Sequence, residues 1–293
     1  MTGILTALMA ALGYGISDFV GGIASRRIAA LRVVLVSYPV ALLLLIVVAM
    51  PFGGELSTAA VVWGLLSGIA QAFGVWWFYA ALGSGPISVV SPLTAILVAG
   101  IPVAAGLALG ERPGPVALVG VVLALAAVVL VSREATDEPL ARRESSTDED
   151  DARPHKFTAR VAWLTVGSGV AFGMNFVLLD QVPHEAELWP LVFGRLAAVS
   201  IVLLAAAVTA NLVLERGVPL RLAVLAGVLD TVANVATLLA LQSSMLSLAG
   251  VLIALYPAAT VLLAIVVLRE RVTRWQAAGI VLALASVGMI AGG

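Results

Sequence analysis

The chain has 293 residues, of which 61% are hydrophobic and 11% charged, with a formal net charge of −1 and no cysteine. About a quarter of the residues of a soluble domain are charged, so this composition excludes a soluble globular protein and indicates a membrane protein. The near-zero net charge argues against a nucleic-acid partner, and the lack of cysteine excludes disulfides, thiolate metal sites and cysteine nucleophiles.

Ten segments are apolar over a length that can span a bilayer, which takes about 18 or more such residues. They are residues 4–23, 33–51, 59–82, 87–109, 115–132, 159–179, 189–213, 221–241, 246–268 and 274–291. The first segment lacks the basic flank of a cleavable signal peptide and contains Asp18, so we expect it to stay as a helix. The sequence therefore predicts an all-α integral membrane protein with ten transmembrane helices.

Residues 133–158 interrupt this pattern. The window 133–160 holds 14 of the 33 charged residues and has no apolar period, which predicts a charged extramembrane linker. The linker divides the chain into residues 1–132 and 159–293, and each part contains five predicted helices.

The two parts are repeats of one another. The pair Glu111-Arg112 recurs as Glu270-Arg271 at an offset of 159 residues, and from Gly120 onward seven of thirteen positions are identical. Repetition at a fixed offset defines the architecture of a chain. Because each repeat crosses the membrane an odd number of times, the second must be inverted relative to the first. Two inverted repeats with a site at their interface are typical of secondary transporters.

The second repeat also carries a longer pattern. Tyr256-Pro257 opens an apolar helix that ends at Glu270-Arg271, and a short bend then leads to Gly279 in a helix of small residues. This pattern resembles the EamA-type family of the drug/metabolite transporter superfamily, and the resemblance covers essentially the whole chain. It implies a ten-helix exporter in the cytoplasmic membrane that moves a small metabolite by alternating access. An amino acid-like, nucleobase-like or cationic drug-like substrate would fit the family.

The repeats have diverged where the pattern matters most. Arg195 stands early in the second helix of its repeat, where such proteins often carry an arginine, but the first repeat has Ser37 there. Likewise, Val98 occupies the position of Pro257. We therefore expect unequal contributions of the two repeats to a site.

Asp230 is the strongest candidate for a functional group inside the membrane. A charge at the bilayer centre costs about 2.5–3.5 kcal/mol on insertion scales, so such groups usually face a polar path or a partner. Asp230 lies about ten residues into its helix, with Asn234 on the same face one turn later, and Gln71 is its equivalent in the first repeat. Burial favours a neutral carboxylic acid, which suggests proton exchange with the substrate or a driving ion. A structural buried pair is the alternative.

Other polar residues complete the predicted path. Arg195 either binds a substrate carboxylate or phosphate, or pairs with Asp180 or Asp230 as part of the structure. Asp18 lies deep in the first helix and either lines the path or reaches an interface. The predicted substrate and proton pathway is Asp18, Gln71, Asn175, Arg195, Asp230, Asn234 and Tyr256.

Two further motifs have a structural and a functional interpretation. Glu111 and Glu270, each beside an arginine, are expected to be solvated charges that set the depth of helix ends. The aromatic run from Trp76 to Tyr79 suits an interfacial belt or, alternatively, a surface on which a flat or cationic substrate stacks.

The sequence contains no Walker loop, metal-ligand spacing or hydrolase motif, so we predict no catalytic residues, no metal and no cofactor. The expected partners are a small-molecule substrate, protons and the lipid bilayer. A lipid-modifying enzyme, a non-transporting scaffold or sensor, and a homodimer stay open as alternatives. The orientation in the membrane also stays open. The side that holds the linker carries 14 of the 16 basic residues, which favours a cytoplasmic location for that side, whereas the resemblance favours cytoplasmic termini.

Overall fold

The computed structural model of the chain describes residues 1–25, 28–82, 84, 87–134, 158–209, 212, 216–268 and 273–292. Within these ranges the chain is helical apart from short connections, and no strand occurs. In chain order the helices are α1 (Thr2–Ser25), α2 (Ala30–Phe52), α3 (Thr58–Leu82), α4 (Ile87–Ala108), α5 (Pro115–Glu134), α7 (Ala159–Asp180), the short 3-10 helix η1 (His184–Ala186), α8 (Trp189–Val208), α9 (Val218–Ser243), α10 (Leu246–Ile253), α11 (Tyr256–Leu268) and α12 (Arg274–Gly292). This confirms the all-α fold with ten apolar segments, because α10 and α11 together form the ninth.

The helices have the length and surface of membrane spans. In the described part of the chain, eight are long and apolar enough to cross a bilayer, and two shorter apolar stretches cover Leu93–Ala108 and Pro115–Val131. Large apolar side chains remain exposed in mid-helix, including Val47, Leu204 and Val281 at 64–66%. Helices satisfy their own backbone hydrogen bonds, so such surfaces are stable in lipid. The protein is a multi-pass membrane protein.

Most predicted boundaries agree with the structure to within a few residues, but α8 is shorter than predicted. It ends at Val208 instead of residue 213. The N–H of Thr209 bonds to the carbonyl of Ala205, and the Thr209 hydroxyl donates to the same oxygen at 2.7 Å, which closes the last turn. The predicted linker falls mainly on residues 135–157, which lie outside the described residues, as do Glu270 and Arg271.

The ninth segment is broken just before a proline. α10 ends at Ile253 and α11 begins at Tyr256. Pro257 has no N–H to donate to the carbonyl of Ile253, and its ring crowds that carbonyl, so a continuous helix is disfavoured there. In the first repeat, Val98 takes the place of this proline and α4 continues through it.

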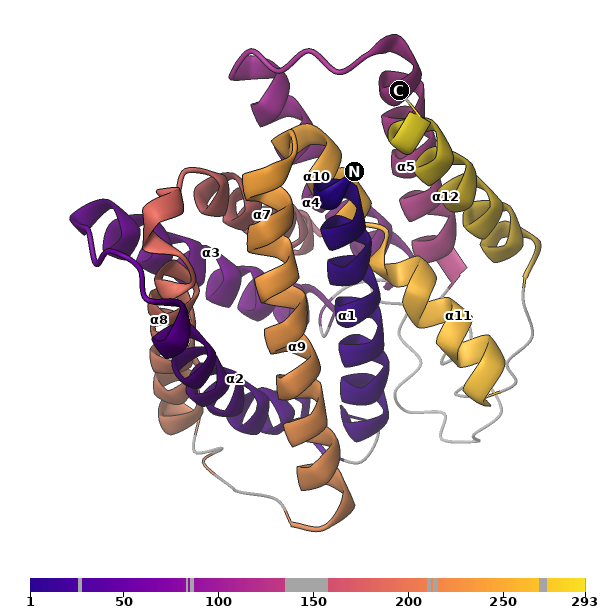
Figure 1. Cartoon of the computed structure of the whole chain (residues 1–293). Coiled ribbons are helices and arrows are strands. Elements are labelled where there is room, and N and C mark those ends of the chain that lie inside the picture. The colour runs from indigo at the N-terminus through magenta and orange to yellow at the C-terminus, as the bar shows by residue number, and fades with distance from the viewer. Residues whose placement is uncertain are drawn as a thin grey trace, which may run out of the picture.

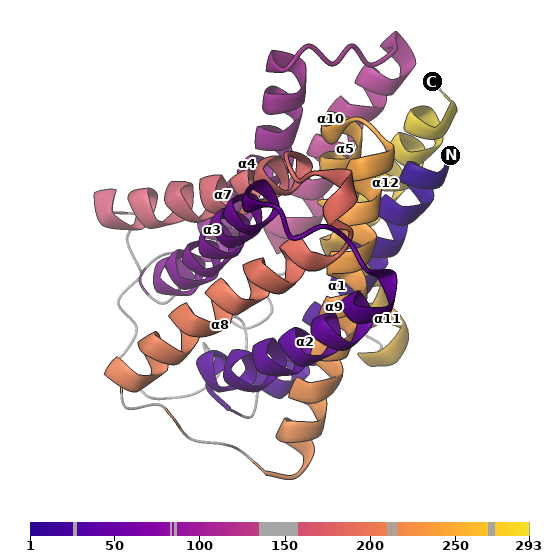
Figure 2. The same cartoon turned by 60° about the vertical axis from the view of Figure 1, so that its left-hand side comes forward.

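The two repeats are intertwined rather than set side by side (Figures 1 and 2). The most extensive packing joins helices of different repeats, and it comes in equivalent pairs. α1 packs on α9 as α7 packs on α3, and α1 packs on α10 and α11 as α7 packs on α4. α5 and α12, the last helices of the two repeats, pack on each other, and both chain ends lie at the same end of the molecule. This is the pattern of a twofold pseudo-axis between inverted repeats.

Equivalent glycines show the same symmetry at the level of single atoms. A β-carbon at Gly120 would lie 3.1 Å from the carbonyl oxygen of Ser286, and one at Gly279 would lie 3.2 Å from that of Ala127. Both glycines and both partners are related by the 159-residue offset. Small residues at these positions allow the two backbones to approach closely, as is common between helices in membranes.

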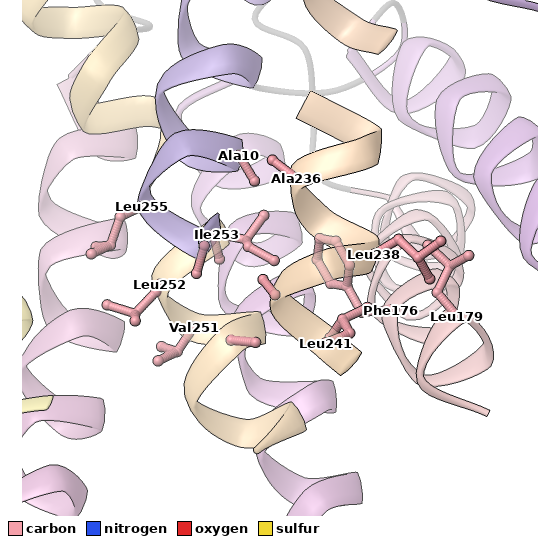
Figure 3. Packing of buried hydrophobic residues seen from close by; sticks show 14 of the residues in the cluster. Ala10, Phe176, Leu179, Ala236, Leu238, Leu241, Val251, Leu252, Ile253 and Leu255 are labelled. Atoms are coloured by element: carbon pink, nitrogen blue, oxygen red, sulfur yellow. The ribbon is translucent and has the colours of Figure 1, made fainter. Parts of the chain in front are cut away.

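The main hydrophobic cluster lies where the second repeat crosses the first (Figure 3). It combines Ala10 from α1, Phe176 and Leu179 from α7, and side chains of α9 and α10. Every residue of α10 except Leu248 is buried. α10 is therefore a fixed part of the core, whereas α11 beyond the break carries exposed residues such as Val266 and Val267.

Several contacts join the repeats at the end of the molecule that holds both termini, which we call the terminal face. The N–H of Glu55 donates to the carbonyl of Glu185 at 2.7 Å, and Trp189 Nε1 donates to the carbonyl of Gly53 at 2.9 Å. His184 Nε2 lies 3.2 Å from the carbonyl oxygen of Gln242 within the second repeat. The connections on this face are thus tied to one another.

Glu111, also on the terminal face, corrects one expectation. Its carboxylate is partly buried and accepts hydrogen bonds from the backbone N–H groups of Leu246, at 2.5 Å, and Ser247, at 2.9 Å. It is therefore a cap on α10 of the other repeat, not a solvated helix-end charge. The physical reason is that Met245, before α10, offers no side-chain cap, so the first amides of that helix need another acceptor.

Candidate functional site

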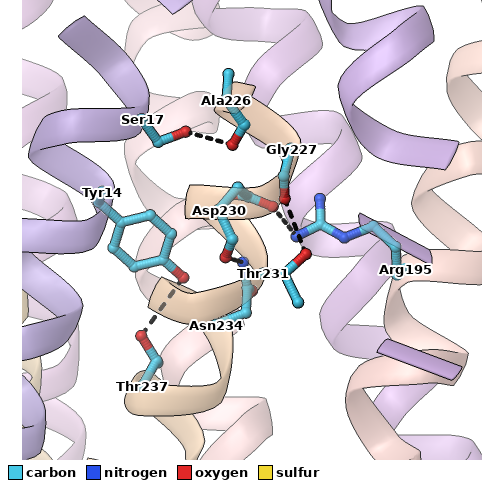
Figure 4. A network of polar contacts seen from close by, with 9 residues as sticks. All are labelled: Tyr14, Ser17, Arg195, Ala226, Gly227, Asp230, Thr231, Asn234 and Thr237. Atoms are coloured by element: carbon cyan, nitrogen blue, oxygen red, sulfur yellow. Dashed lines mark hydrogen bonds and ion pairs between the residues drawn. The ribbon is translucent and has the colours of Figure 1, made fainter. Parts of the chain in front are cut away.

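The centre of the molecule holds an ion pair between the guanidinium of Arg195, on α8, and the carboxylate of Asp230, on α9 (Figure 4). Arg195 Nη2 donates to Asp230 Oδ2. The Arg195 side chain is 2% exposed and that of Asp230 19%. Asp230 lies halfway along α9, so the pair is near mid-membrane. A buried arginine is costly unless it is paired, and the carboxylate supplies the partner.

Glycine contacts bring this pair to the repeat interface. A β-carbon on Gly68 of α3 would overlap the carbonyl of Gly194, the residue before Arg195. On the equivalent side, a β-carbon on Gly227 of α9 would lie 2.5 Å from the carbonyl oxygen of Ser37. The helices can touch at these points because the residues lack side chains. Arg195 and Asp230 each lie within one helical turn of one of these contacts, so the close packing of the helices brings the two side chains together.

The pair has further support on both sides. Arg195 Cζ lies 4.6 Å from the centroid of the Tyr38 ring, a favourable cation–π contact. Asn234 Nδ2 donates to the backbone carbonyl of Asp230 at 2.7 Å. Arg195 Nη1 is buried and has no hydrogen-bond partner in the described part of the chain. The guanidinium is therefore held firmly but keeps unused donor capacity.

A second group of polar side chains faces α9 from α1. The hydroxyls of Thr237 and Tyr14 lie 3.4 Å apart, and the Tyr14 ring packs edge-on against Tyr256 with centroids 6.3 Å apart. Ser17 Oγ donates to the carbonyl of Ala226 at 3.0 Å. Figure 4 shows this group on the other side of α9 from Arg195. α9 thus has polar contacts on both sides, through Asp230, Asn234 and Thr237, and we call this row of residues the polar axis.

The structure gathers most of the predicted pathway around this axis. Arg195, Asp230 and Asn234 are in direct contact, and Tyr256 joins through Tyr14. Asp18 lies one turn from Tyr14 on the same face of α1. Its side chain is exposed, whereas that of Ser17 beside it is buried.

Gln71 and Asn175 are not connected to the ion pair. Gln71 lies partly buried on α3 and Asn175 buried on α7, and neither makes a side-chain hydrogen bond to another residue within the described ranges. Asp180 lies at the end of α7, where it accepts a hydrogen bond from Gln181 at 3.1 Å, and the partner of Arg195 is Asp230. The role of each residue in transport stays a prediction.

Four polar side chains of the site were not among the predicted pathway residues: Tyr14, Ser17, Tyr38 and Thr237. Tyr14 appeared in the sequence as a neighbour of Asp18, one turn away. Tyr38 carried a usable signal, because it follows Ser37, the repeat equivalent of Arg195. The pseudo-symmetry that places Arg195 at the centre also places the neighbourhood of Ser37 there.

Three rings of the aromatic run on α3, those of Trp76, Trp77 and Phe78, pack against other side chains in this structure. Trp77 covers Gly167 of α7, and Phe78 packs edge-on against Phe172 with centroids 6.4 Å apart. Trp76 is 55% exposed and stacks on Phe73 at 6.0 Å, on the outer surface of the bundle. The ring that contacts the Arg195 guanidinium is that of Tyr38 on α2.

The fold and the site define a class: a multi-pass helical membrane protein of two inverted repeats with a charged pair at their interface. The model of the EamA-like transporter family matches residues 1–133 and again residues 159–292, so the chain belongs to that family. A solved structure titled "Crystal structure of protein" has the same fold, with a TM-score of 0.74 and 18% identity over 98% of this chain and 95% of that chain. No curated protein matches the sequence.

Proposed function

We propose that the protein is a secondary transporter that exports a small metabolite across the cytoplasmic membrane by alternating access. The observation that carries the proposal is the buried Arg195–Asp230 pair at the interface between inverted repeats. A cation and an anion side by side, with hydroxyl, amide and aromatic groups nearby, can exchange their mutual contact for contacts with a small polar substrate. Amino acid-like, nucleobase-like and cationic drug-like compounds all offer such groups.

The distribution of contacts supports an alternating mechanism. The connections on the terminal face are joined by hydrogen bonds, which favours a closed state there. Asp18 is exposed and lies further along α1 from the terminal face than Tyr14, which favours access from the opposite face. Because the repeats are related by a pseudo-twofold axis, the opposite state follows by exchanging the conformations of the two repeats.

Protons are the driving ion that the site suits best. Asp230 lies at the centre, Asp18 lies one turn from Tyr14 on α1, and the Tyr14 ring contacts Tyr256. One carboxylate is paired with Arg195, and the other makes no salt bridge within the described residues. A proton or a cationic substrate group would balance the second negative charge.

Flux into proteoliposomes tests the proposal. Purified protein is reconstituted with and without an imposed pH gradient and offered a panel of amino acids, nucleobases and organic cations. We expect saturable flux of one class, lost in Asp230→Asn and kept in Arg221→Gln, which changes an exposed arginine on the same helix. Folded protein with no flux for any class would point to a scaffold or sensor. Full flux and full response to the pH gradient in Asp230→Asn would remove Asp230 from the mechanism.

A further inference from the structure

Glu111 joins the two repeats through two hydrogen bonds at a place away from the central site. Both of its carboxylate oxygens are used, Oε1 by the N–H of Leu246 and Oε2 by the N–H of Ser247. These are the first two residues of α10, and Leu246 and Ser247 are 1% and 0% exposed. A carboxylate that accepts two amides at a helix N-terminus is held by hydrogen bonds and by the helix dipole.

The loop that carries Glu111 is shaped to deliver this carboxylate. The N–H of Glu111 donates to the carbonyl of Gly106 at 2.9 Å, so the loop folds back on the end of α4. Any β-carbon at Gly106 would overlap Glu111 Oε2, so the carboxylate fills the space that the missing side chain leaves. The same two helices, α4 and α10, approach again where Gly250 faces Pro102.

The helix that Glu111 caps leads directly to the central site. α10 is buried up to Ile253, the chain breaks before Pro257, and Tyr256 then contacts Tyr14. One end of this split helix is thus fixed to the first repeat, while its continuation lines the polar axis. Opening the terminal face would pull the α4–α5 connection away from α10 and break both hydrogen bonds.

We propose that Glu111 is a positioning residue that latches the terminal face shut by capping α10 across the repeat interface. The latch rests on the proposed transport function, because it gives the closed terminal face a defined stabilising contact. Glu111→Gln keeps one acceptor oxygen but sets an NH2 group against the second amide, so it weakens the latch with little change in volume.

Thiol labelling in nanodiscs tests the latch, and the chain helps because it contains no cysteine. Ala10→Cys places a thiol at a buried position in the half of α1 nearer the terminal face, and Asp18→Cys places one at an exposed position nearer the other face. With Glu111→Gln, we expect a water-soluble maleimide to label Cys at position 10 about tenfold faster and at position 18 more slowly. Glu185→Gln, an exposed carboxylate on the terminal face, should change neither rate.

A faster labelling rate at position 10 together with a slower rate at position 18 distinguishes a latch from a general loss of stability, which would raise both rates. Unchanged rates, or a rise at both positions, would overturn the proposal. A second pair of variants leaves Glu111 intact: Leu246→Pro removes one donor N–H at a helix position that accepts proline, whereas Leu246→Ala shortens the side chain and keeps the donor. Only Leu246→Pro should change the two labelling rates as Glu111→Gln does. Equal labelling rates in Leu246→Pro and Leu246→Ala would also overturn the proposal. Labelling needs no substrate, so a protein without flux would refute transport and leave this test valid.

Discussion

The Arg195–Asp230 pair should behave as one thermodynamic unit. Asp230→Asn leaves a guanidinium that is 2% exposed without its counter-charge, and removing one partner of a buried pair costs about 3–5 kcal/mol. We expect a loss of about 3 kcal/mol in the free energy of unfolding, at the lower end of this range. The contact between Arg195 and Tyr38 remains, and the amide introduced at position 230 can still accept a hydrogen bond from Arg195. Arg195→Gln should cost about 2–3 kcal/mol, because the remaining carboxylate is 19% exposed but the Tyr38 contact is lost.

The double variant is the decisive comparison. With both charges removed, no unpaired ion remains, so the combined loss should fall short of the sum of the single losses by about 2 kcal/mol. The free energy of unfolding can be measured by titrating mixed micelles with a denaturing detergent, with Arg221→Gln as the control. If the double variant lost the sum of the two singles to within about 0.5 kcal/mol, the two groups would not act as a pair and the reasoning would be refuted.

Three further predictions follow from the packing. Gly68→Ala should destabilise the protein by at least about 2 kcal/mol in the same titration, because its β-carbon overlaps the Gly194 carbonyl; Gly100→Ala, with open space around it, should be neutral or stabilising. Tyr14→Phe should lower the free energy of unfolding by less than about 1 kcal/mol, because the 3.4 Å contact to the Thr237 hydroxyl is long; a larger loss would mean a stronger bond. Pro257→Ala restores the missing N–H, so α10 and α11 should join; we expect unchanged or higher stability with flux slowed several-fold, and unaltered flux would show that the break is not needed.

The helices were predictable from the sequence because a membrane imposes one strong condition on the chain. Each span must be apolar over bilayer length and must satisfy its own backbone, so the ten segments are visible as runs of residues. The inverted repeats were predictable as well, since the offset that relates Gly120 to Gly279 is written in the chain. The break before Tyr256 needed the structure, because prolines also occur within the unbroken α4.

The candidate site was predictable only in part. Polarity inside a span identified Arg195 and Asp230, but the choice between Asp180 and Asp230 as partner depends on the helix contacts at Gly68 and Gly227. Glu111 was misjudged because its partners belong to a helix start in the other repeat, which no local pattern reveals. A contact between residues of different repeats, such as that of Glu111 with Leu246, leaves no signal in the local sequence.

The intertwined packing has a consequence for how the protein is made. The first repeat leaves the ribosome before α7–α12 exist, yet α1, α2 and α3 have their main packing partners in that later half. Until then the glycine faces of these helices, and the backbone of Ser37, must be covered by lipid or by an insertion factor. Final assembly is therefore a late event in which the second half threads its helices among five that are already in the membrane.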